Sequence, residues 1–249
     1  MDFVQVFGRA AADYDSVIPF FRTFGERLVD YVDVQPGDDV LDLASGRGAT
    51  VFPALARGAG VVATDLAPEM VEALRADGVD ARLMDAQEPE GNADYDVVLC
   101  AFSVGFLPDR ATAFANWRRV LRNGGRVGLS VPTGANDEMM FFGDVAKQFV
   151  AMPPPFPPGD IRAELTAAGF TGVEEHDDEA LFVFPDEEAW WRWVNSQGQR
   201  AAIERVPADR LDAFKEACFE RLRPSRQPDG YHLVQRARYT RCQSFHTGS

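Results

Sequence analysis

Lysine is nearly missing from this sequence. Only Lys147 and Lys215 occur among the 25 basic residues, and 39 acidic residues give a formal net charge of −14. A surface of that sign repels phosphate-rich polymers. We therefore expect no nucleic-acid partner.

Cysteine and long apolar runs are also scarce. Cys100, Cys218 and Cys242 lack the paired spacing of a disulfide framework or a zinc site. The longest apolar run, residues 97–107, is shorter than a membrane helix. The N-terminus shows neither the basic nor the apolar region of a signal peptide. We expect a cytoplasmic protein without a bound metal or a membrane partner.

Apolar material is plentiful. The 249 residues are 46% apolar and 26% charged, which suffices for one large α/β unit or two small domains. From residue 39 onward, short apolar runs alternate with helical stretches, a pattern typical of a parallel sheet. The expected strands are 40–43, 61–64, 81–84, 97–101 and 127–131.

Helical spacing marks the segments around these strands. Residues 2–32 are expected to form one or two amphipathic helices. The other expected helices are 50–57, 68–77, 112–121, 138–150, 160–168 and a helical insertion from 186 to about 223. A stiff proline-rich loop is expected at 153–158, with extended stretches near 173–176, 181–184 and 231–242. The last of these should pair antiparallel with 181–184.

No repeat or flexible linker divides the chain, so we expect a single domain over residues 1–249. Residues 1–36 form N-terminal helices and 37–131 the ligand-binding core. The insertions 132–158 and 185–229 are interpreted as a lid on that domain rather than as a second domain.

The first expected strand ends in a turn of small residues. Residues 42–48 are Asp-Leu-Ala-Ser-Gly-Arg-Gly, and a helix follows at once. Glycines there let the backbone approach a ligand at a helix N-terminus. The second strand ends in Asp65, where an acidic side chain accepts hydrogen bonds from a ribose diol. The ligand should therefore contain a nucleoside.

A dinucleotide is the first candidate for that ligand. The G-x-G-x-x-G fingerprint would require glycine at position 51, where the chain has Val51. Neither lysine belongs to a Tyr-x-x-x-Lys pair. An NAD(P)-dependent oxidoreductase is thus an alternative, as is a non-catalytic nucleoside-binding protein.

Five motifs in order resemble the class I S-adenosylmethionine-dependent methyltransferases, in particular the ubiquinone/menaquinone-biosynthesis type and related bacterial small-molecule enzymes. They are the 42–48 turn, Asp65, Asp85-Ala86-Gln87, Asp-Val-Val-Leu-Cys at 96–100 and Leu-Arg-Asn-Gly-Gly at 121–125. The resemblance covers about residues 10–131 by motif. It implies a Rossmann-like, doubly wound α/β fold with a seven-stranded, mostly parallel sheet and an antiparallel last strand. It also implies S-adenosyl-L-methionine as cofactor.

The resemblance assigns roles around the methionine and ribose. Gly46 and Gly48 would face the methionine part of the cofactor, and Asp42 would orient that loop and meet the amino group. Asp65 would hold both ribose hydroxyls.

The adenine would be held by two further segments. Leu66 and Met70 would flank it, although both also suit a core at helical spacing. Asp85 with Ala86 would receive its exocyclic amine. The expected cofactor-binding set is Asp42, Ala44, Ser45, Gly46, Gly48, Asp65, Leu66, Met70, Asp85, Ala86 and Cys100.

The implied reaction displaces a methyl group from a sulfonium. The protein mainly aligns donor and acceptor and excludes water, and a base is needed only when the acceptor must first lose a proton. His176 lies in an acidic run, His232 begins the last strand, and His246 lies in a tail expected to be disordered. None has a motif around it, so no catalytic residue is assigned.

Aromatic residues outside the core motifs are candidates for the substrate site. An apolar, aromatic or prenyl-like small molecule would suit them. The same residues also suit plain core packing, and Tyr14 equally suits a staple onto the core. The substrate-binding candidates are Tyr14, Phe102, Phe106, Phe142, Trp190 and Trp191.

A macromolecular methyltransferase is a further alternative. After the fourth strand the chain has Cys-Ala-Phe-Ser at 100–103, rather than an Asn/Asp-Pro-Pro-Tyr turn or a Pro-Cys nucleophile. The acceptor atom stays open, and we expect a monomer or homodimer.

Overall fold

The computed structural model describes residues 3–11, 13–152 and 159–245. The expected loop at 153–158 and His246 lie outside these residues. The chain divides into two compact units. Unit 1 comprises 1–20, 133–155 and 179–236, and unit 2 comprises 21–132, 156–178 and 237–249. The single domain and the lid stay predictions.

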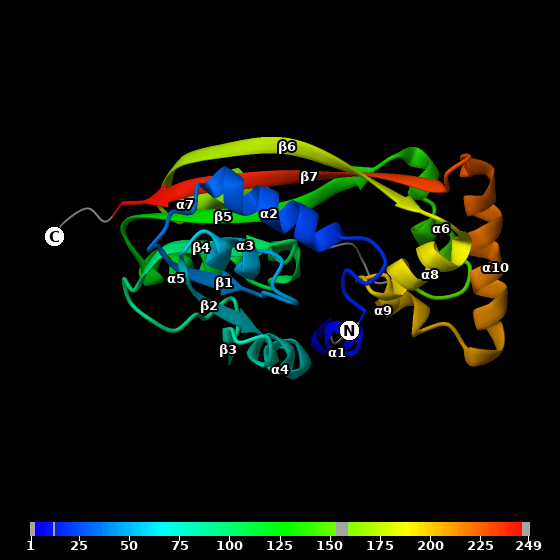
Figure 1. The fold of residues 1–249 in the computed structure, drawn as a ribbon, viewed down its shortest axis with the longest axis horizontal. Helices are drawn as coiled ribbons and strands as arrows, with labels where there is room; N and C mark the ends of the chain where they lie inside the picture. Colours follow the sequence, from blue (N-terminus) through cyan, green and yellow to red (C-terminus); the bar gives the residue numbers. More distant parts are fainter. Residues whose placement is uncertain (1–2, 12, 153–158, 246–249) are drawn as a thin grey trace. The chain divides into compact units, whose positions relative to one another are not determined.

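Unit 2 is built on a parallel sheet (Figure 1). Its parallel strands are β1 (Asp39–Leu43), β2 (Gly60–Asp65), β3 (Asp80–Leu83), β4 (Tyr95–Ala101) and β5 (Leu121–Ala135). The order in the full sheet is β3-β2-β1-β4-β5-β7-β6. That order reverses between β1 and β4, and doubly wound sheets bind their ligands beyond the carboxyl ends of strands at such a point.

Helices cover both faces of this sheet because alternate residues of each strand point to opposite faces. On one face, Phe114 and Trp117 of α5 (Arg110–Val120) join Val98 of β4 in one buried cluster. On the other face, α2 (Phe20–Val32) approaches β5 so closely that a Cβ on Gly128 would lie 2.1 Å from Val32 Cγ2. The remaining helices of unit 2 are α3 (Val51–Ala56), α4 (Pro68–Ala76) and α7 (Ile161–Ala167), with the 3-10 turn η1 (Val104–Phe106).

The last two strands are antiparallel. β6 (Phe170–Phe184) pairs with β7 (Tyr231–Ser244), and β7 runs opposite to both β5 and β6 in Figure 1. Cross-strand ion pairs follow the antiparallel register, because the residue number rises along β6 as it falls along β7: Glu174 pairs with Arg241, and Asp177 pairs with Arg238. The two stretches expected separately at 173–176 and 181–184 belong to one strand. The acidic residues between them pair with arginines of β7, and these pairs hold the segment in the sheet. The predicted fold class is confirmed.

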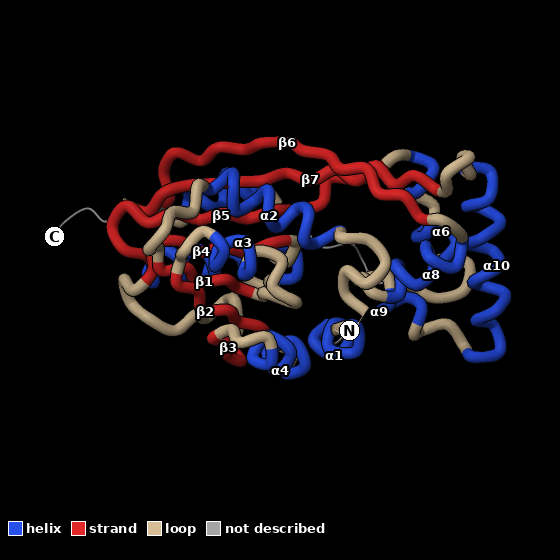
Figure 2. The backbone as a smooth tube through the Cα atoms, viewed as in Figure 1, coloured by secondary structure: helices blue, strands red, loops and turns tan. Residues whose placement is uncertain are grey.

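Unit 1 contains the N-terminal helix and most of both insertions. Short helices and loops make up much of the insertions (Figure 2). The helix expected at 138–150 is wrong: a turn, η2, and a short helix, α6, occupy the segment, with Gly143 inside α6. Glycine costs helix stability, and the neighbouring side chains Phe141 and Phe142 pack on different partners, Trp190 and Phe214. The elements are α1 (Phe3–Ala10), η2 (Asp137–Met139), α6 (Phe142–Ala146), α8 (Glu187–Asn195), α9 (Arg200–Ile203), η3 (Ala208–Arg210), α10 (Leu211–Leu222) and η4 (Arg223–Ser225).

None of the helices in the described ranges has the length and apolar character of a membrane span.

Candidate cofactor and substrate site

Buried hydrogen bonds hold the loop after β1 against the end of β2. The Ser45 hydroxyl donates to the Asp42 carbonyl at 2.9 Å and accepts from the Thr64 amide at 3.0 Å. The Thr64 hydroxyl donates to the same Asp42 carbonyl at 3.1 Å. Two neighbouring strand ends are thereby fixed in register, so the loop keeps its shape without a ligand.

Asp42 presents a buried carboxylate oxygen. The side chain is 1% exposed, and its Oδ2 accepts from the Thr50 hydroxyl at 2.7 Å. Its Oδ1 has no hydrogen-bond partner among the residues that the structure describes. Burial raises the pKa of Asp42 to about 7, against the lowering effect of its hydrogen bonds. A cationic donor group fits this oxygen, because it would bond to Oδ1 and favour the charged carboxylate.

Asp65 joins the loop after β1 to the start of α4. Its Oδ2 accepts from the Gly46 amide at 2.9 Å, and its Oδ1 accepts from the Ala67 amide at 2.9 Å. Burial raises the pKa of this carboxyl, while the amide bonds lower it. Each carboxylate oxygen has a second lone pair. The side chain can therefore hold the loop and still accept hydrogen bonds from a diol.

The backbone is strained where the sheet order reverses. Ala44 after β1 has a φ of 53°, and Phe102 after the adjacent strand β4 has a φ of 56°. Side-chain-bearing residues rarely adopt this left-handed conformation, and such strain gathers at functional sites. Gly46 and Gly48, at φ 53° and 83°, adopt it without a Cβ clash. The sequence carries no sign of the strain at Phe102.

Helix α5 fixes the loop after β3. The Trp117 indole donates to the Ala86 carbonyl at 2.6 Å, and the Asn116 amide donates to the Gln87 carbonyl at 2.8 Å. Asp85 Oδ1 caps the turn by accepting from the Gln87 amide at 2.8 Å. Sequence reasoning missed Trp117 and Asn116 as positioning residues, because their spacing on the helix indicated nothing beyond packing.

The predicted cofactor residues differ in accessibility. Asp42, Ala44, Ser45, Gly46 and Asp65 lie together in the network at the ends of β1 and β2, and Gly48 closes the same loop. Leu66 is 44% exposed, whereas Met70 is 1% and Cys100 0% exposed. Burial also raises the pKa of the Cys100 thiol.

The predicted substrate residues are split between the units. In unit 2, half-buried Phe102 packs edge-on against Phe24 at 5.5 Å, and Phe106 ends η1. In unit 1, Trp190 is buried against Phe141, and Phe142 against Phe214, at ring distances of 5.3 and 5.7 Å. Two further candidates of unit 1, Tyr14 and Trp191, are half-buried.

The two described histidines lie on β6 and β7. His176 is exposed and stacks on Tyr31 at 5.6 Å, within the aromatic stack that Tyr239 extends. The His232 Nε2 lies 2.8 Å from Asp229 Oδ1.

Comparison with known proteins identifies the family. Residues 41–129 match the model of the methyltransferase domain. Nocamycin O-methyltransferase of Saccharothrix syringae is 34% identical over 84% of this chain and 86% of its own length. Aklanonic acid methyltransferase DauC of Streptomyces sp. strain C5 is 36% identical over 51% of this chain and 64% of its own.

A solved structure shares the fold. The phosphoethanolamine N-methyltransferase 2 of Haemonchus contortus in complex with S-adenosyl-L-methionine has a TM-score of 0.56 at 16% identity, covering 90% of this chain and 53% of that chain.

The chain therefore belongs to the class I S-adenosylmethionine-dependent methyltransferases of bacterial small-molecule type. As a member of that family it uses S-adenosylmethionine and methylates a small molecule. This membership decides against the NAD(P)-dependent oxidoreductase.

Proposed function

We propose that this chain transfers a methyl group from S-adenosylmethionine to an oxygen atom of a small apolar or aromatic metabolite. The observation that carries the oxygen acceptor is the similarity to nocamycin O-methyltransferase, which extends over 84% of the chain. The aromatic side chains of the substrate candidates support an apolar acceptor.

The cofactor contacts are proposed from the polar atoms that can still accept a hydrogen bond. Asp42 Oδ1 accepts from the cofactor's ammonium group, since it is the buried oxygen without a partner among the described residues. The backbone of the Ala44–Gly48 loop faces the methionine part, and Asp65 accepts from the ribose hydroxyls.

The adenine contacts follow from exposure. Leu66 is exposed and packs on the adenine, while the Asp85–Ala86 turn receives its amine. Met70 and Cys100 are buried and support the site from beneath rather than touching the ligand.

The bound cofactor supplies an electrophilic methyl group on a sulfonium. The chain aligns the reactants and excludes water, which reduces the entropic cost of reaching the transition state. We assign no general base: His176 is exposed and stacks on Tyr31 and Tyr239, and His232, which pairs with the exposed Asp229, belongs to unit 1.

Phe102 and Phe106 of unit 2 are proposed to contact the acceptor, as are, separately, Tyr14 and Trp191 of unit 1. Within unit 1, Phe142 and Trp190 are proposed as the buried layer behind the half-buried rings. The lid role of the insertions 132–158 and 185–229 is likewise proposed. Hydrogen exchange in both insertions should slow when S-adenosylhomocysteine and acceptor are bound, while β1 and β4 stay protected throughout. Uniform protection without ligand would refute the lid.

The cellular location and the kind of partner are proposed from the cysteines and the net charge. Three unpaired, buried cysteines support a cytoplasmic location, and the net charge of −14 supports a small-molecule enzyme without a nucleic-acid partner. We propose a monomer or a homodimer.

The reaction is tested with purified protein, S-adenosylmethionine and aklanonic acid, with simple phenols as further acceptors. Mass spectrometry should show a product heavier by one CH2 unit, formed together with S-adenosylhomocysteine. The Gly46→Val variant, which should not bind the cofactor, is the control for chemical methylation in solution. Methylation at nitrogen or carbon alone, across acceptors that also offer hydroxyl groups, would contradict the oxygen acceptor.

A further inference from the structure

Two buried hydrogen-bond donors in unit 1 lack acceptors among the residues that the structure describes. The Trp193 side chain is 8% exposed and Gln197 is 6% exposed. Neither Trp193 Nε1 nor Gln197 Nε2 has a hydrogen-bond partner in the part of the chain that the structure describes. Buried donors are nearly always bonded, so each of these requires a physical explanation.

The two donors lie at the C-terminal end of α8. Trp193 is in the last turn of α8, which ends at Asn195, and Gln197 follows in a turn where its backbone N–H donates to the Val194 carbonyl at 3.4 Å. Trp193 and Gln197 are four residues apart, the spacing at which side chains on a helix are neighbours. Two side-chain donors at this spacing can converge on a single acceptor atom.

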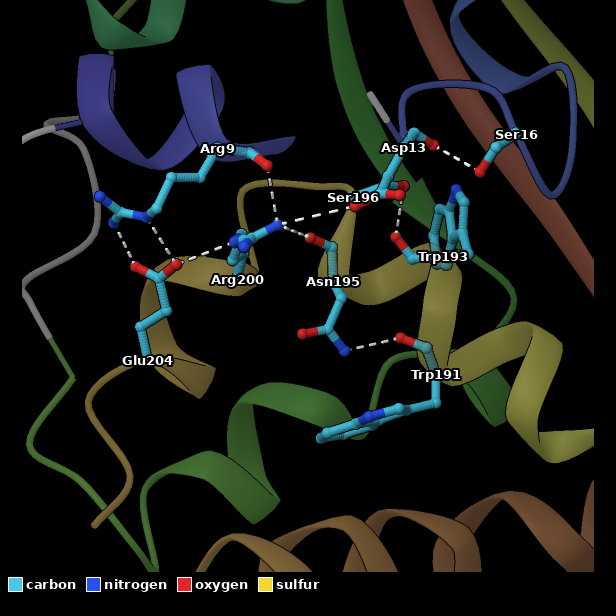
Figure 3. A network of polar contacts seen from close by, with 9 residues as sticks. All are labelled: Arg9, Asp13, Ser16, Trp191, Trp193, Asn195, Ser196, Arg200 and Glu204. Carbon is cyan, nitrogen blue, oxygen red and sulfur yellow. Dashed lines mark hydrogen bonds and ion pairs between the residues drawn. The ribbon is translucent and has the colours of Figure 1, made fainter. Parts of the chain in front are cut away.

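Their surroundings are aromatic. The Trp193 ring lies 5.7 Å from Phe20 and 5.3 Å from Phe184, and Phe20 lies 5.5 Å from Phe182. Figure 3 shows the Trp193 carbonyl accepting from Ser196, with no bond drawn to the indole nitrogen. The polar edge of the indole therefore interrupts an otherwise apolar cluster within unit 1.

We propose that Trp193 Nε1 and Gln197 Nε2 bind one oxygen atom of an aromatic acceptor metabolite. The proposal rests on the proposed function and adds a recognition site for the substrate. An indole N–H and an amide N–H are neutral donors, so they match a carbonyl, ether or phenolic oxygen rather than a strongly charged group. The aromatic cluster packs against the ring system that carries this oxygen.

The first test is the stability of the free protein. The Trp193→Phe variant loses ring volume and an unbonded N–H, whereas Trp117→Phe loses the same volume and the bond to the Ala86 carbonyl. We expect the melting temperature to fall by several degrees more in Trp117→Phe. Gln197→Met should leave it unchanged or raised, as should the control Gln148→Met at an exposed position. A clear fall in Gln197→Met would mean that a structural water holds the donors, and would overturn the proposal.

The second test is a matched pair of probes, 1-naphthol and naphthalene, which differ in one oxygen. With S-adenosylhomocysteine present, the wild type should bind 1-naphthol about threefold to tenfold more tightly, the range expected for one hydrogen bond. Trp193→Phe and Gln197→Met should each reduce the preference, and the double variant should bind the two probes equally, while Gln148→Met keeps the preference. Equal binding by the wild type, or no binding of either probe, would overturn the proposal.

The proposed function fails on a separate readout. If the protein binds S-adenosylhomocysteine and prefers 1-naphthol but methylates no oxygen, the oxygen site stands and the reaction assignment falls. If hydroxylated aromatics are methylated at the same rate by wild type and Gln197→Met, the reaction stands and the oxygen site falls.

Discussion

Unit 2 and unit 1 bury polar side chains to different effect. In unit 2 the Trp117 indole and the Ser45 hydroxyl bond to main-chain carbonyls and fix the loops of the proposed cofactor site, which leaves the buried acceptor Asp42 Oδ1 for the ligand. In unit 1 the donors of Trp193 and Gln197 have no acceptor among the described residues. The first arrangement preorganises backbone around a ligand, whereas the second leaves donors to be satisfied on binding. Variants in the loops of the proposed cofactor site should therefore affect cofactor binding, and variants in unit 1 should not.

The largest effect is expected from Gly46→Val. A β-branched residue is strongly disfavoured at φ 53°, and its side chain would occupy the ligand face of the loop. Calorimetry should detect no binding of S-adenosylhomocysteine, while the melting temperature without ligand should fall no further than in the control variant at Gly78, which carries the same kind of backbone strain. Gly78→Val is the control, since Gly78 has a φ of 84° and nothing within 4 Å of an added Cβ. Normal binding by Gly46→Val would show that the loop is wrongly assigned.

Asp65→Ala should weaken S-adenosylhomocysteine binding by about tenfold or more. Loss of a carboxylate that accepts from the ribose costs about 1–3 kcal/mol. The loop tie to Gly46 and Ala67 is lost as well, so a lower melting temperature should accompany the weaker binding. Asp80→Ala, at the exposed start of β3, is the control. Unchanged affinity would remove Asp65 from the site.

Asp42→Asn should change how stability depends on pH. Burial raises the pKa of Asp42 from 3.8 to about 7, so the folded state favours the neutral form. The stability contributed by this group is full below pH 3.8 and is lost as the pH rises through about 7. The free energy of unfolding of Asp42→Asn, relative to that of the wild type, should rise between pH 5 and pH 8.5 by a few kcal/mol, since each pKa unit corresponds to about 1.4 kcal/mol.

Urea unfolding at both pH values measures this gain. The exposed substitution Asp209→Asn should show no such change. Saturating S-adenosylhomocysteine should reduce the difference in free energy of unfolding between Asp42→Asn and the wild type at high pH, because its ammonium group compensates the buried carboxylate. A gap that does not vary with pH would contradict the assignment.

The smallest effect is expected from Glu204→Gln in unit 1. Glu204 pairs with Arg9 of α1 and Arg200 of α9, and Figure 3 shows both contacts. The side chains of Arg9 and Glu204 are 47% and 31% exposed, so solvent screens the pair. Unfolding should become easier by about 0–1 kcal/mol. S-adenosylhomocysteine affinity should stay the same, and a tenfold loss would break the distinction between the units.

The local pattern of apolar residues was sufficient to predict the strands of the parallel core. The expected strands 40–43 and 97–101 lie within β1 and β4, because strands buried on both faces are continuous apolar runs bounded by turns. Asp42 and Asp65 were located by motif, and the structure places them in one hydrogen-bonded network around the loop after β1.

Pairing between residues far apart in the sequence could not be predicted from the local pattern. The acidic centre of β6 has no apolar period, and its extended conformation depends on arginines of β7 more than fifty residues away, such as Arg241 on Glu174. The strain at Phe102 and the missing acceptors of Trp193 and Gln197 are properties of three-dimensional packing. The spacing of residues along the sequence indicates neither the strain nor the missing acceptors.

The edge position of β6 has a consequence for behaviour at high concentration. An edge strand exposes main-chain donors and acceptors that another chain could extend into a larger sheet. Along β6 the acidic side chains of Glu174, Asp177 and Glu179 pair with β7 arginines yet stay more than half exposed. Two such edges approaching each other would bring like charges together, which opposes intermolecular sheet growth. Acidification toward the isoelectric point, about 4.6, neutralises part of those carboxylates and brings the net charge of the protein to zero, so the protein should become prone to ordered aggregation there while remaining dispersed near neutrality.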